Sequence, residues 1–174
     1  FYIQYFQPPG IAEAELEADP EATIRRVSYS LSGDAPGDRV IAGVLGDGNG
    51  FLTATTDPET LPAWLTAAEI AYVAAEFRRT GFRGALNWYR HFGRNAELLA
   101  AWRGASLRQP SLFIVGERDD VLKFPGARDR VARLPQVLPG LRGTHIVEGA
   151  GHWIQRERAE AVNALLIDFL NGLP

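Results

Sequence analysis

Apolar residues recur at helical spacing through most of residues 1–104. Residues 10–32 are predicted to be helical, with a break before Pro20, a residue suited to a first helical turn. The apolar positions that follow this proline are Ile24, Val27 and Leu31. Gly33 is predicted to end the helix, and the Gly-, Asp-, Pro- and Thr-rich residues 33–62 are predicted to form loops.

A capping box predicts the start of the next helix. The hydroxyl of Thr66 can accept a hydrogen bond from a free main-chain N–H, while Glu69 reaches back to the main chain of Thr66. Apolar residues at helical spacing and a closing pair of arginines then lead to Gly81, where the helix is predicted to end. Further helices are predicted over residues 85–92 and 95–102.

From Pro110 onward the pattern changes to alternating strands and helices. Residues 112–115 predict a buried strand, and residues 144–147 a second strand. Amphipathic helical segments are expected at residues 126–134 and 157–170. Strand, helix, strand, helix is typical of an α/β fold and implies a parallel sheet.

This change of pattern predicts two regions with a boundary near Gly104. Residues 1–104 form the mainly helical region, and residues 105–174 form the α/β region.

Composition and charge narrow the classes of function. The chain has 174 residues and a formal net charge of −3, and its arginines do not cluster into a basic block, so no nucleic-acid surface is expected. No apolar stretch approaches the roughly 18 residues needed to span a bilayer, so no membrane insertion is expected. The absence of Cys excludes disulfides and thiol chemistry and is compatible with a reducing compartment, so we expect a cytoplasmic protein. Because the chain also lacks Met, we expect it to be the C-terminal part of a longer polypeptide or one chain of a processed protein.

An acid and a histidine follow the two predicted strands. Asp119 and His152 fall just beyond strand ends, where functional groups gather in open α/β sheets. Gly149 and Gly151 permit the tight backbone needed to present an imidazole from a loop. A carboxylate bonded to one ring nitrogen would orient His152 as a general base. The spacing is equally compatible with His152 as a structural histidine and Asp119 as a turn former.

Other titratable residues compete for these roles. Asp120 is an alternative acid beside Asp119. His145 is expected within the second strand and His91 near a helix end, so neither shares the loop context of His152. No two histidines have the spacing of a metal site, so no metal is expected.

Two tyrosine segments remain to be interpreted. Tyr2 and Tyr5 lie in an aromatic segment at the start of the chain, and Tyr89 lies on a predicted helix. Aromatic residues at such spacing are typical of packing, but two converging phenols could also bind and protonate an oxygen leaving group.

Together these segments resemble the epoxide hydrolases of the α/β-hydrolase superfamily. The motifs that carry the resemblance are Tyr2–Gln7, Gly10–Glu17, Gly81–Arg90, Phe113–Asp119 and Gly149–Gln155. The resemblance implies an α/β-hydrolase fold in which residues 1–104 are a helical cap, or lid, and residues 105–174 are the C-terminal part of the core. The N-terminal half of the core, with the nucleophile, would then lie outside this chain.

The resemblance also assigns roles to residues. Tyr2 and Tyr89 match the two lid tyrosines that bind and protonate the epoxide oxygen, with Tyr5 ranked below Tyr2. Asp119 matches the acid that orients the base, and His152 matches the base. The positions that match the lining of a substrate pocket are Val121, Leu122, Trp153 and Trp88.

The implied reaction converts a small-molecule epoxide into a vicinal diol without a metal or an organic cofactor. An aspartate of the N-terminal half would form an alkyl-enzyme ester, and His152 would activate the water that hydrolyses it. The N-terminal half of the same enzyme is thus the expected partner, and a homodimer is left open.

Three alternatives stay open. A haloalkane or haloacid dehalogenase would use the same aspartate-ester chemistry without needing a tyrosine pair. A serine esterase, with serine as the nucleophile, would not require the tyrosine pair either. The third alternative is that the chain is an inert fragment or a binding module.

Overall fold

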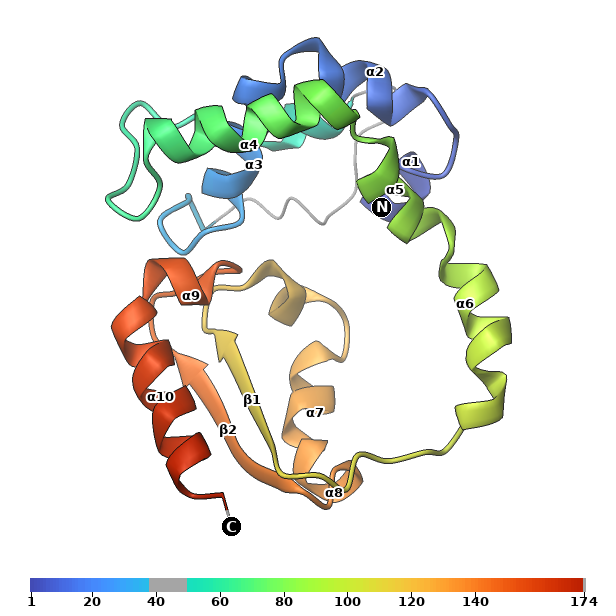
Figure 1. The fold of residues 1–174 in the computed structure, drawn as a ribbon, viewed down its shortest axis with the longest axis vertical. Coiled ribbons are helices and arrows are strands. Elements are labelled where there is room, and N and C mark those ends of the chain that lie inside the picture. Colours follow the sequence, from blue (N-terminus) through green and yellow to red (C-terminus); the bar gives the residue numbers. More distant parts are fainter. Residues whose placement is uncertain (38–49, 174) are drawn as a thin grey trace. The chain divides into compact units, whose positions relative to one another are not determined.

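The structure, a computed structural model, describes residues 1–37 and 50–173 in two compact units (Figure 1). Unit 1 contains Phe1–Ser30 and residues 50–103, and unit 2 contains Leu31–Gly37 and residues 104–173. The predicted loop over residues 33–62 falls partly on residues 38–49, which lie outside the described residues. The lid and core identities expected for the two regions stay predictions.

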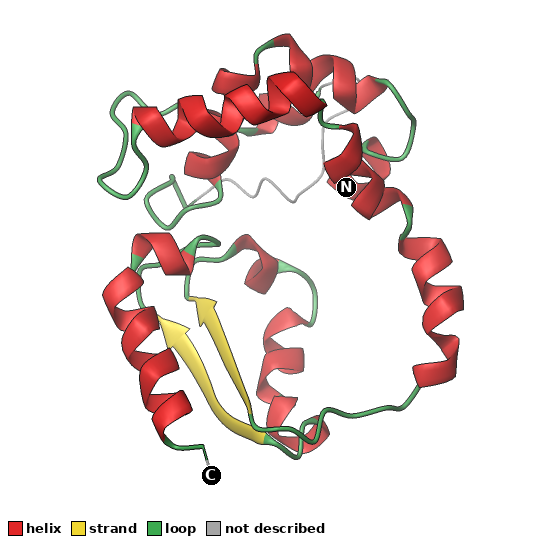
Figure 2. Ribbon diagram, in the orientation of Figure 1, coloured by secondary structure: helices red, strands yellow, loops and turns green. Residues whose placement is uncertain are grey.

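In the described part of unit 1 the regular elements are all helices, joined by loops, as Figure 2 shows. Its elements are α1 (Tyr2–Tyr5), α2 (Ile11–Ala18), α3 (Pro20–Ser30), η1 (Phe51–Ala54), α4 (Ala67–Thr80), α5 (Arg83–Arg90), α6 (Phe92–Leu98) and η2 (Leu99–Trp102). Here η denotes a 3₁₀ helix.

The predicted break before Pro20 is confirmed, because α2 ends and α3 begins there. The Asp19 carboxylate accepts a hydrogen bond from the N–H of Ala22 at 3.0 Å and so caps α3. The predicted end of this helix at Gly33 is wrong, since α3 already ends at Ser30.

The capping box that opens α4 is confirmed. The N–H of Glu69 donates to the Thr66 hydroxyl at 3.3 Å, and the N–H of Thr66 donates to the Glu69 carboxylate at 3.0 Å. The helix ends at Gly81, whose φ of 70° favours glycine. The ring of Phe77 in α4 stacks on that of Phe82, just after Gly81, with the ring centroids 4.1 Å apart. This contact fixes the turn that leads into α5.

The helix over residues 85–92 corresponds to α5, which is shifted two residues toward the N-terminus. The helix over residues 95–102 is two elements, α6 and η2, of which α6 already starts at Phe92. The side chains that form the core of unit 1 come from α2, η1, α4 and α5 and from residues beside the helices. The buried ones are Phe6, Ala12, Leu16, Phe51, Leu65, Ile70, Ala74, Phe82 and Leu86.

Unit 2 has the parallel sheet that the sequence predicts. Strand β1 (Ser111–Gly116) pairs in parallel with β2 (Leu141–Val147), so that Gly116 lies opposite Val147 (Figure 2). The helices of unit 2 are η3 (Asp120–Lys123), α7 (Ala127–Ala132), α8 (Leu134–Val137), α9 (Ile154–Glu157) and α10 (Ala159–Asn171). The predicted closing helix over residues 157–170 is thus interrupted at Arg158.

A small apolar core fixes the end of the sheet. Val147, Ala150 and Val162 are buried together, and the half-buried Ile114, Ile154 and Leu165 pack against them. Strand β1 is less buried than predicted: within residues 112–115 only Val115 is fully buried. The described sheet has two strands, so β1 has a hydrogen-bonded neighbour on one side. Within residues 1–37 and 50–173, no helix is long and apolar enough to cross a membrane.

Candidate active site

The parallel pairing of β1 and β2 brings the loops after both strands to one edge of the sheet. The ladder continues beyond the strands, where the N–H of Glu117 donates to Val147 O at 2.9 Å and the N–H of Arg118 donates to Ala150 O at 2.8 Å. Asp119 follows directly on the first loop, and His152 lies on the second. The geometry therefore brings together the two residues that the spacing predicts as a pair.

The imidazole of His152 lies within hydrogen-bond distance of the Asp119 carboxylate. Its Nδ1 is 3.2 Å from Asp119 Oδ2 and 3.3 Å from Oδ1. The N–H of Val121 also donates to Oδ1 at 2.9 Å and orients the carboxylate. When Nδ1 carries the proton, it donates to Asp119 and leaves Nε2 as the basic nitrogen.

The two side chains differ strongly in exposure. The side chain of Asp119 is 10% exposed, while that of His152 is 41% exposed. This is the arrangement a general base needs, because the orienting acid is shielded while the ring can reach a water molecule. The indole of Trp153 meets the imidazole edge to face, with ring centroids 5.0 Å apart.

Each partner shifts the pKa of the other in the direction expected for an ion pair. The hydrogen bond from Asp119 raises the pKa of His152 above its usual 6.5, against an opposing effect of burial, and the charges of Asp119, Asp120 and Glu157 add to the rise. Burial acts to raise the pKa of Asp119, but the hydrogen bonds from His152 and Val121 and the charges of His152 and Lys123 outweigh it. The net pKa of Asp119 is therefore lowered.

The competing titratable residues lie elsewhere. Asp120 is buried and forms an ion pair with Lys123, with 2.8 Å between Nζ and Oδ1. His145 lies within β2, as predicted. His91 is the C-cap residue of α5, and its Nδ1 lies 2.7 Å from Asn87 O. The hydrogen-bond geometry therefore favours Asp119 as the partner of His152.

In unit 1 the two tyrosines of the resemblance come together. The rings of Tyr2 on α1 and Tyr89 on α5 meet edge to face, with centroids 5.7 Å apart and planes at 80°. Phe6 and Phe51 pack around them. Burial, and then the nearby Tyr89, raise the pKa of Tyr2, so this phenol keeps its proton at neutral pH.

Tyr5 has a different environment from Tyr2. Its hydroxyl donates to the Glu15 carboxylate at 2.8 Å, and the N–H groups of Phe51 and Leu52 donate to the same carboxylate at 2.9 Å. Burial and this hydrogen bond to Glu15 raise the pKa of Tyr5 to about 12. Tyr5 thus contributes to packing of α1, which agrees with its lower rank.

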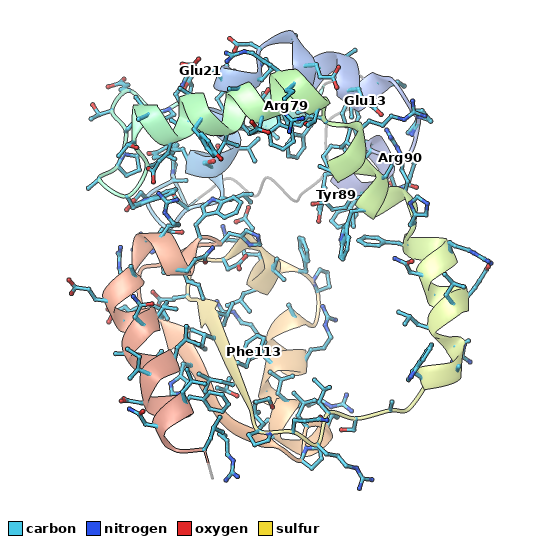
Figure 3. The ribbon with its side chains drawn as sticks, viewed as in Figure 1. Glu13, Glu21, Arg79, Tyr89, Arg90 and Phe113 are labelled. Carbon is cyan, nitrogen blue, oxygen red and sulfur yellow. The ribbon has the colours of Figure 1, made fainter. Side chains whose placement is uncertain are left out.

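An ion pair between Arg90 and Glu13 and the side-chain amide of Gln7 connect the segments that carry Tyr2 and Tyr89. The guanidinium of Arg90 binds both oxygens of Glu13, with N···O distances of 2.7 and 2.9 Å, and its Nε donates to Phe6 O at 2.8 Å (Figure 3). The side chain of Gln7 donates to Tyr89 O at 3.2 Å and to Ile3 O at 2.8 Å.

The predicted pocket residues occupy different surroundings. Val121 and Trp88 are exposed, Trp88 to 69%, while Trp153 is half-buried. Leu122 is buried and lines a hollow of about 250 Å³ in unit 2. The other residues lining this hollow are Arg128, Val131, Ala132, Pro135, Thr144 and Ile146. The positions of these residues do not test their substrate-binding roles, which stay predictions.

Several residues that hold the site were not assigned from the sequence. Glu13, Gln7 and Arg90 lie inside the quoted motifs, but nothing in their local pattern indicated the contacts that they make. Glu157 was predicted only as the start of a helix, and no local signal linked it to the histidine loop. Among the described residues, no group of three or more His, Asp or Glu side chains could hold a metal ion.

Substitution of Asp119 by Asn should lower the pKa of His152. The variant removes the charge and weakens the hydrogen bond that raise this pKa, while burial continues to lower it. Because the pKa in the folded state is raised, the pair stabilises the fold below pH 6.5, and this contribution is lost as pH rises through the folded pKa. NMR titration of the imidazole resonances would measure the shift, with His91 as internal control. An unchanged His152 titration would contradict this account.

Substitution of Glu13 by Ala should destabilise unit 1. Glu13 and Arg90 are each 11% exposed, and removing one partner of such a pair costs about 3 kcal/mol. The hydrogen bond to Arg90 lowers the pKa of Glu13 to about 2 from 4.5, so wild-type stability should fall as pH drops from 4.5 toward 2. Urea unfolding at several pH values would show whether the variant lacks this acid-dependent loss. The exposed Glu97→Ala, which breaks a surface pair with Arg94, should change little.

Comparison with known proteins extends this picture. No family model matches the chain. The chain is 46% identical to Epoxide hydrolase A of Mycobacterium tuberculosis over 175 residues, which cover 99% of the chain and 52% of that protein. It is 37% identical to Epoxide hydrolase 1 of Siraitia grosvenorii, with 98% of the chain and 52% of that protein covered.

Solved structures give the same result. Epoxide Hydrolase A from Mycobacterium thermoresistibile is 45% identical, with a TM-score of 0.84, over the whole chain and 53% of that protein. An epoxide hydrolase from an endophytic Streptomyces is 42% identical, with a TM-score of 0.89, over 99% of the chain and 52% of that protein. The chain thus spans about half the length of the relatives it matches. It is a relative of the epoxide hydrolases of the α/β-hydrolase superfamily and corresponds to their C-terminal part.

Proposed function

We propose that this chain supplies the lid tyrosines and the water-activating pair of an epoxide hydrolase. The complete enzyme would convert an epoxide and water into a vicinal diol through an alkyl-enzyme ester. The nucleophilic aspartate would come from an N-terminal half, which is the proposed partner of this chain. The single observation that carries the proposal is the pairing of Tyr2 with Tyr89, because a hydrolase that acts on esters or haloalkanes has no use for two adjacent phenols.

Ring opening is the half-reaction assigned to the tyrosines. An aspartate oxygen attacks an epoxide carbon, the ring C–O bond breaks, and the developing alkoxide takes a proton from a phenol. Tyr2 and Tyr89 are both half-buried, and burial raises the pKa of Tyr2, so this phenol stays protonated until the more basic alkoxide forms. A neutral donor that is already in place stabilises charge only as it forms on the oxygen, which lowers the barrier.

Ester hydrolysis is the half-reaction assigned to His152 and Asp119. Nε2 of His152 takes a proton from water, and the resulting hydroxide attacks the ester carbonyl, so that the acyl C–O bond breaks and the diol leaves with the regenerated aspartate. The imidazolium then loses its proton and the phenolate left by ring opening gains one, which restores both groups. The imidazolium that forms is stabilised by the carboxylate at 3.2 Å. The same carboxylate holds the tautomer in which Nε2 is the base.

The finer assignments are part of the same proposal. Val121, Leu122, Trp153 and Trp88 would line the path of the substrate. A cytoplasmic location and a homodimer remain predictions of the sequence.

Removal of both phenols should abolish ring opening in the enzyme completed by its N-terminal half. Loss of one positioned donor costs about 10²- to 10³-fold in kcat, so Tyr2→Phe or Tyr89→Phe should each slow alkylation by this order. The double variant should show none. Single-turnover measurement of ester formation with styrene oxide would test this, and Tyr72→Phe is the matched control because Tyr72 is an exposed tyrosine of α4. Undiminished alkylation by the double variant would refute the roles of the tyrosines.

Substitution of His152 by Gln should impair the second half-reaction, hydrolysis of the ester, and not the first. Ring opening should proceed and the ester should accumulate to one equivalent, because water is no longer activated. Intact-mass spectrometry would detect the adduct. Release of halide from haloalkanes, in place of diol from epoxides, would instead identify a dehalogenase. Residues 1–174 alone should show no turnover.

A further inference from the structure

Glu157 is a buried carboxylate whose hydrogen bonds converge on the loop of His152. Its Oε2 accepts the N–H of Gly151 at 2.8 Å, and its Oε1 accepts the N–H of Trp153 at 3.0 Å. The main-chain N–H groups of the residues before and after His152 are thus bound to the same side chain. Glu157 itself is 8% exposed and belongs to the short helix α9.

The same carboxylate binds a segment that is distant in the sequence. Oε2 of Glu157 also accepts the N–H of Gly33 at 2.8 Å, and the N–H of His152 donates to Leu31 O at 2.9 Å. Arg118, next to Asp119, donates to Gly33 O at 2.8 Å. The segment from Leu31 to Gly33 is therefore fixed to both loops that carry the candidate base and acid.

The main chains of this segment and of the histidine loop approach each other closely. A Cβ on Gly151 would lie 2.4 Å from Gly33 N and 2.5 Å from Leu31 O, so no side chain fits there. Such a close approach leaves the main-chain N–H groups shielded from water, and each needs an acceptor. Glu157 supplies acceptors for three of them at once.

We propose that Glu157 is the positioning residue for His152: it fixes the main chain on both sides of the histidine and joins it to the segment from Leu31 to Gly33. The proposal rests on the proposed role of His152 as the base. The imidazole is 41% exposed and is held at Nδ1 by contacts of 3.2 to 3.3 Å with Asp119. A ring held so loosely keeps its direction only if the main chain that carries it is fixed.

A carboxylate suits this role better than an amide. It presents two acceptor oxygens and no donor, whereas the amide of Gln presents one oxygen and an NH₂ group. Glu157→Gln has nearly the same shape, but it sets a donor against at least one main-chain N–H. The variant also removes a negative charge from the surroundings of His152, where Asp119 and Asp120 remain, with Lys123 beside them.

The test compares Glu157→Gln with Glu117→Gln in the enzyme completed by its N-terminal half. Glu117 is the matched control because its carboxylate accepts a single N–H of the same loop, from Gly149 at 3.0 Å. Single-turnover kinetics would separate ester formation from ester hydrolysis. We expect Glu157→Gln to slow hydrolysis by about tenfold to a hundredfold, the order of effect of a small misplacement of a reacting group, and to leave alkylation unchanged. Glu117→Gln should leave both rates unchanged.

NMR titration of His152 gives a second readout that does not depend on turnover. Glu157→Gln should lower the His152 pKa and speed hydrogen exchange at Gly151 and Trp153, while His91 is unaffected. A variant with a lower Tm but unchanged hydrolysis rate and titration would show that Glu157 only stabilises the fold, and would overturn the proposal. If wild-type protein forms no ester, the proposed function fails, but the titration still decides this inference.

If Glu157→Gln does not fold, Glu157→Asp provides the test. It keeps the charge but shortens the reach, so it cannot bind Gly33 and Trp153 together. We expect hydrolysis to slow in this variant as well. Wild-type hydrolysis in a folded Glu157→Asp protein would overturn the proposal.

Discussion

Main-chain N–H groups withdrawn from water need acceptors, and in this chain glutamate carboxylates supply several of them in both units. In unit 1, Glu15 accepts from two peptides of η1, and Glu13 accepts from Gly10 and from the guanidinium of Arg90. In unit 2, Glu157 accepts from three peptides around His152. A charged acceptor with several donors recovers the cost of its own burial, because charge-assisted hydrogen bonds are about twice as strong as neutral ones. The loops and short helices of both units depend on these carboxylates for their shape.

The proposed chemistry needs two opposite protonation states at one pH. A phenol must keep its proton until ring opening, and the imidazole must lack one when water is activated. The ordinary pKa of a phenol, about 10, already meets the first requirement, and burial raises the pKa of Tyr2 further. For His152 the bond to Asp119 also raises the pKa, which makes the ring a stronger base but reduces its unprotonated fraction. Partial burial opposes this rise, so the gain in base strength and the loss of the unprotonated form are both smaller than the hydrogen bond alone would give.

The features that the sequence predicted correctly are those that depend on residues close together along the chain. The capping box of α4, the break before Pro20 and the positions of Asp119 and His152 after two parallel strands all follow from local pattern, and the structure confirms them. The contacts that hold the site connect residues far apart: Glu13 and Arg90 are 77 positions apart, and Gly33 and Glu157 are 124 apart. A single sequence contains no signal for such pairs. The predicted end of a helix at Gly33 failed for the same reason, since this glycine serves a close main-chain approach and not a helix terminus.

The tyrosine pair says more about the function than the acid–histidine pair does. A histidine oriented by a buried carboxylate can activate water against any ester, so its geometry leaves the substrate open. The choice of substrate depends on how the first bond is broken, and that step requires a donor matched to the leaving group. An oxygen that stays attached to the product needs a proton, whereas a departing halide needs only weak donors. Two half-buried phenols in contact, one with its pKa raised, fit the first requirement. The identity of the proposed reaction therefore depends on the contact between Tyr2 of α1 and Tyr89 of α5, although the proposed base lies in the other unit.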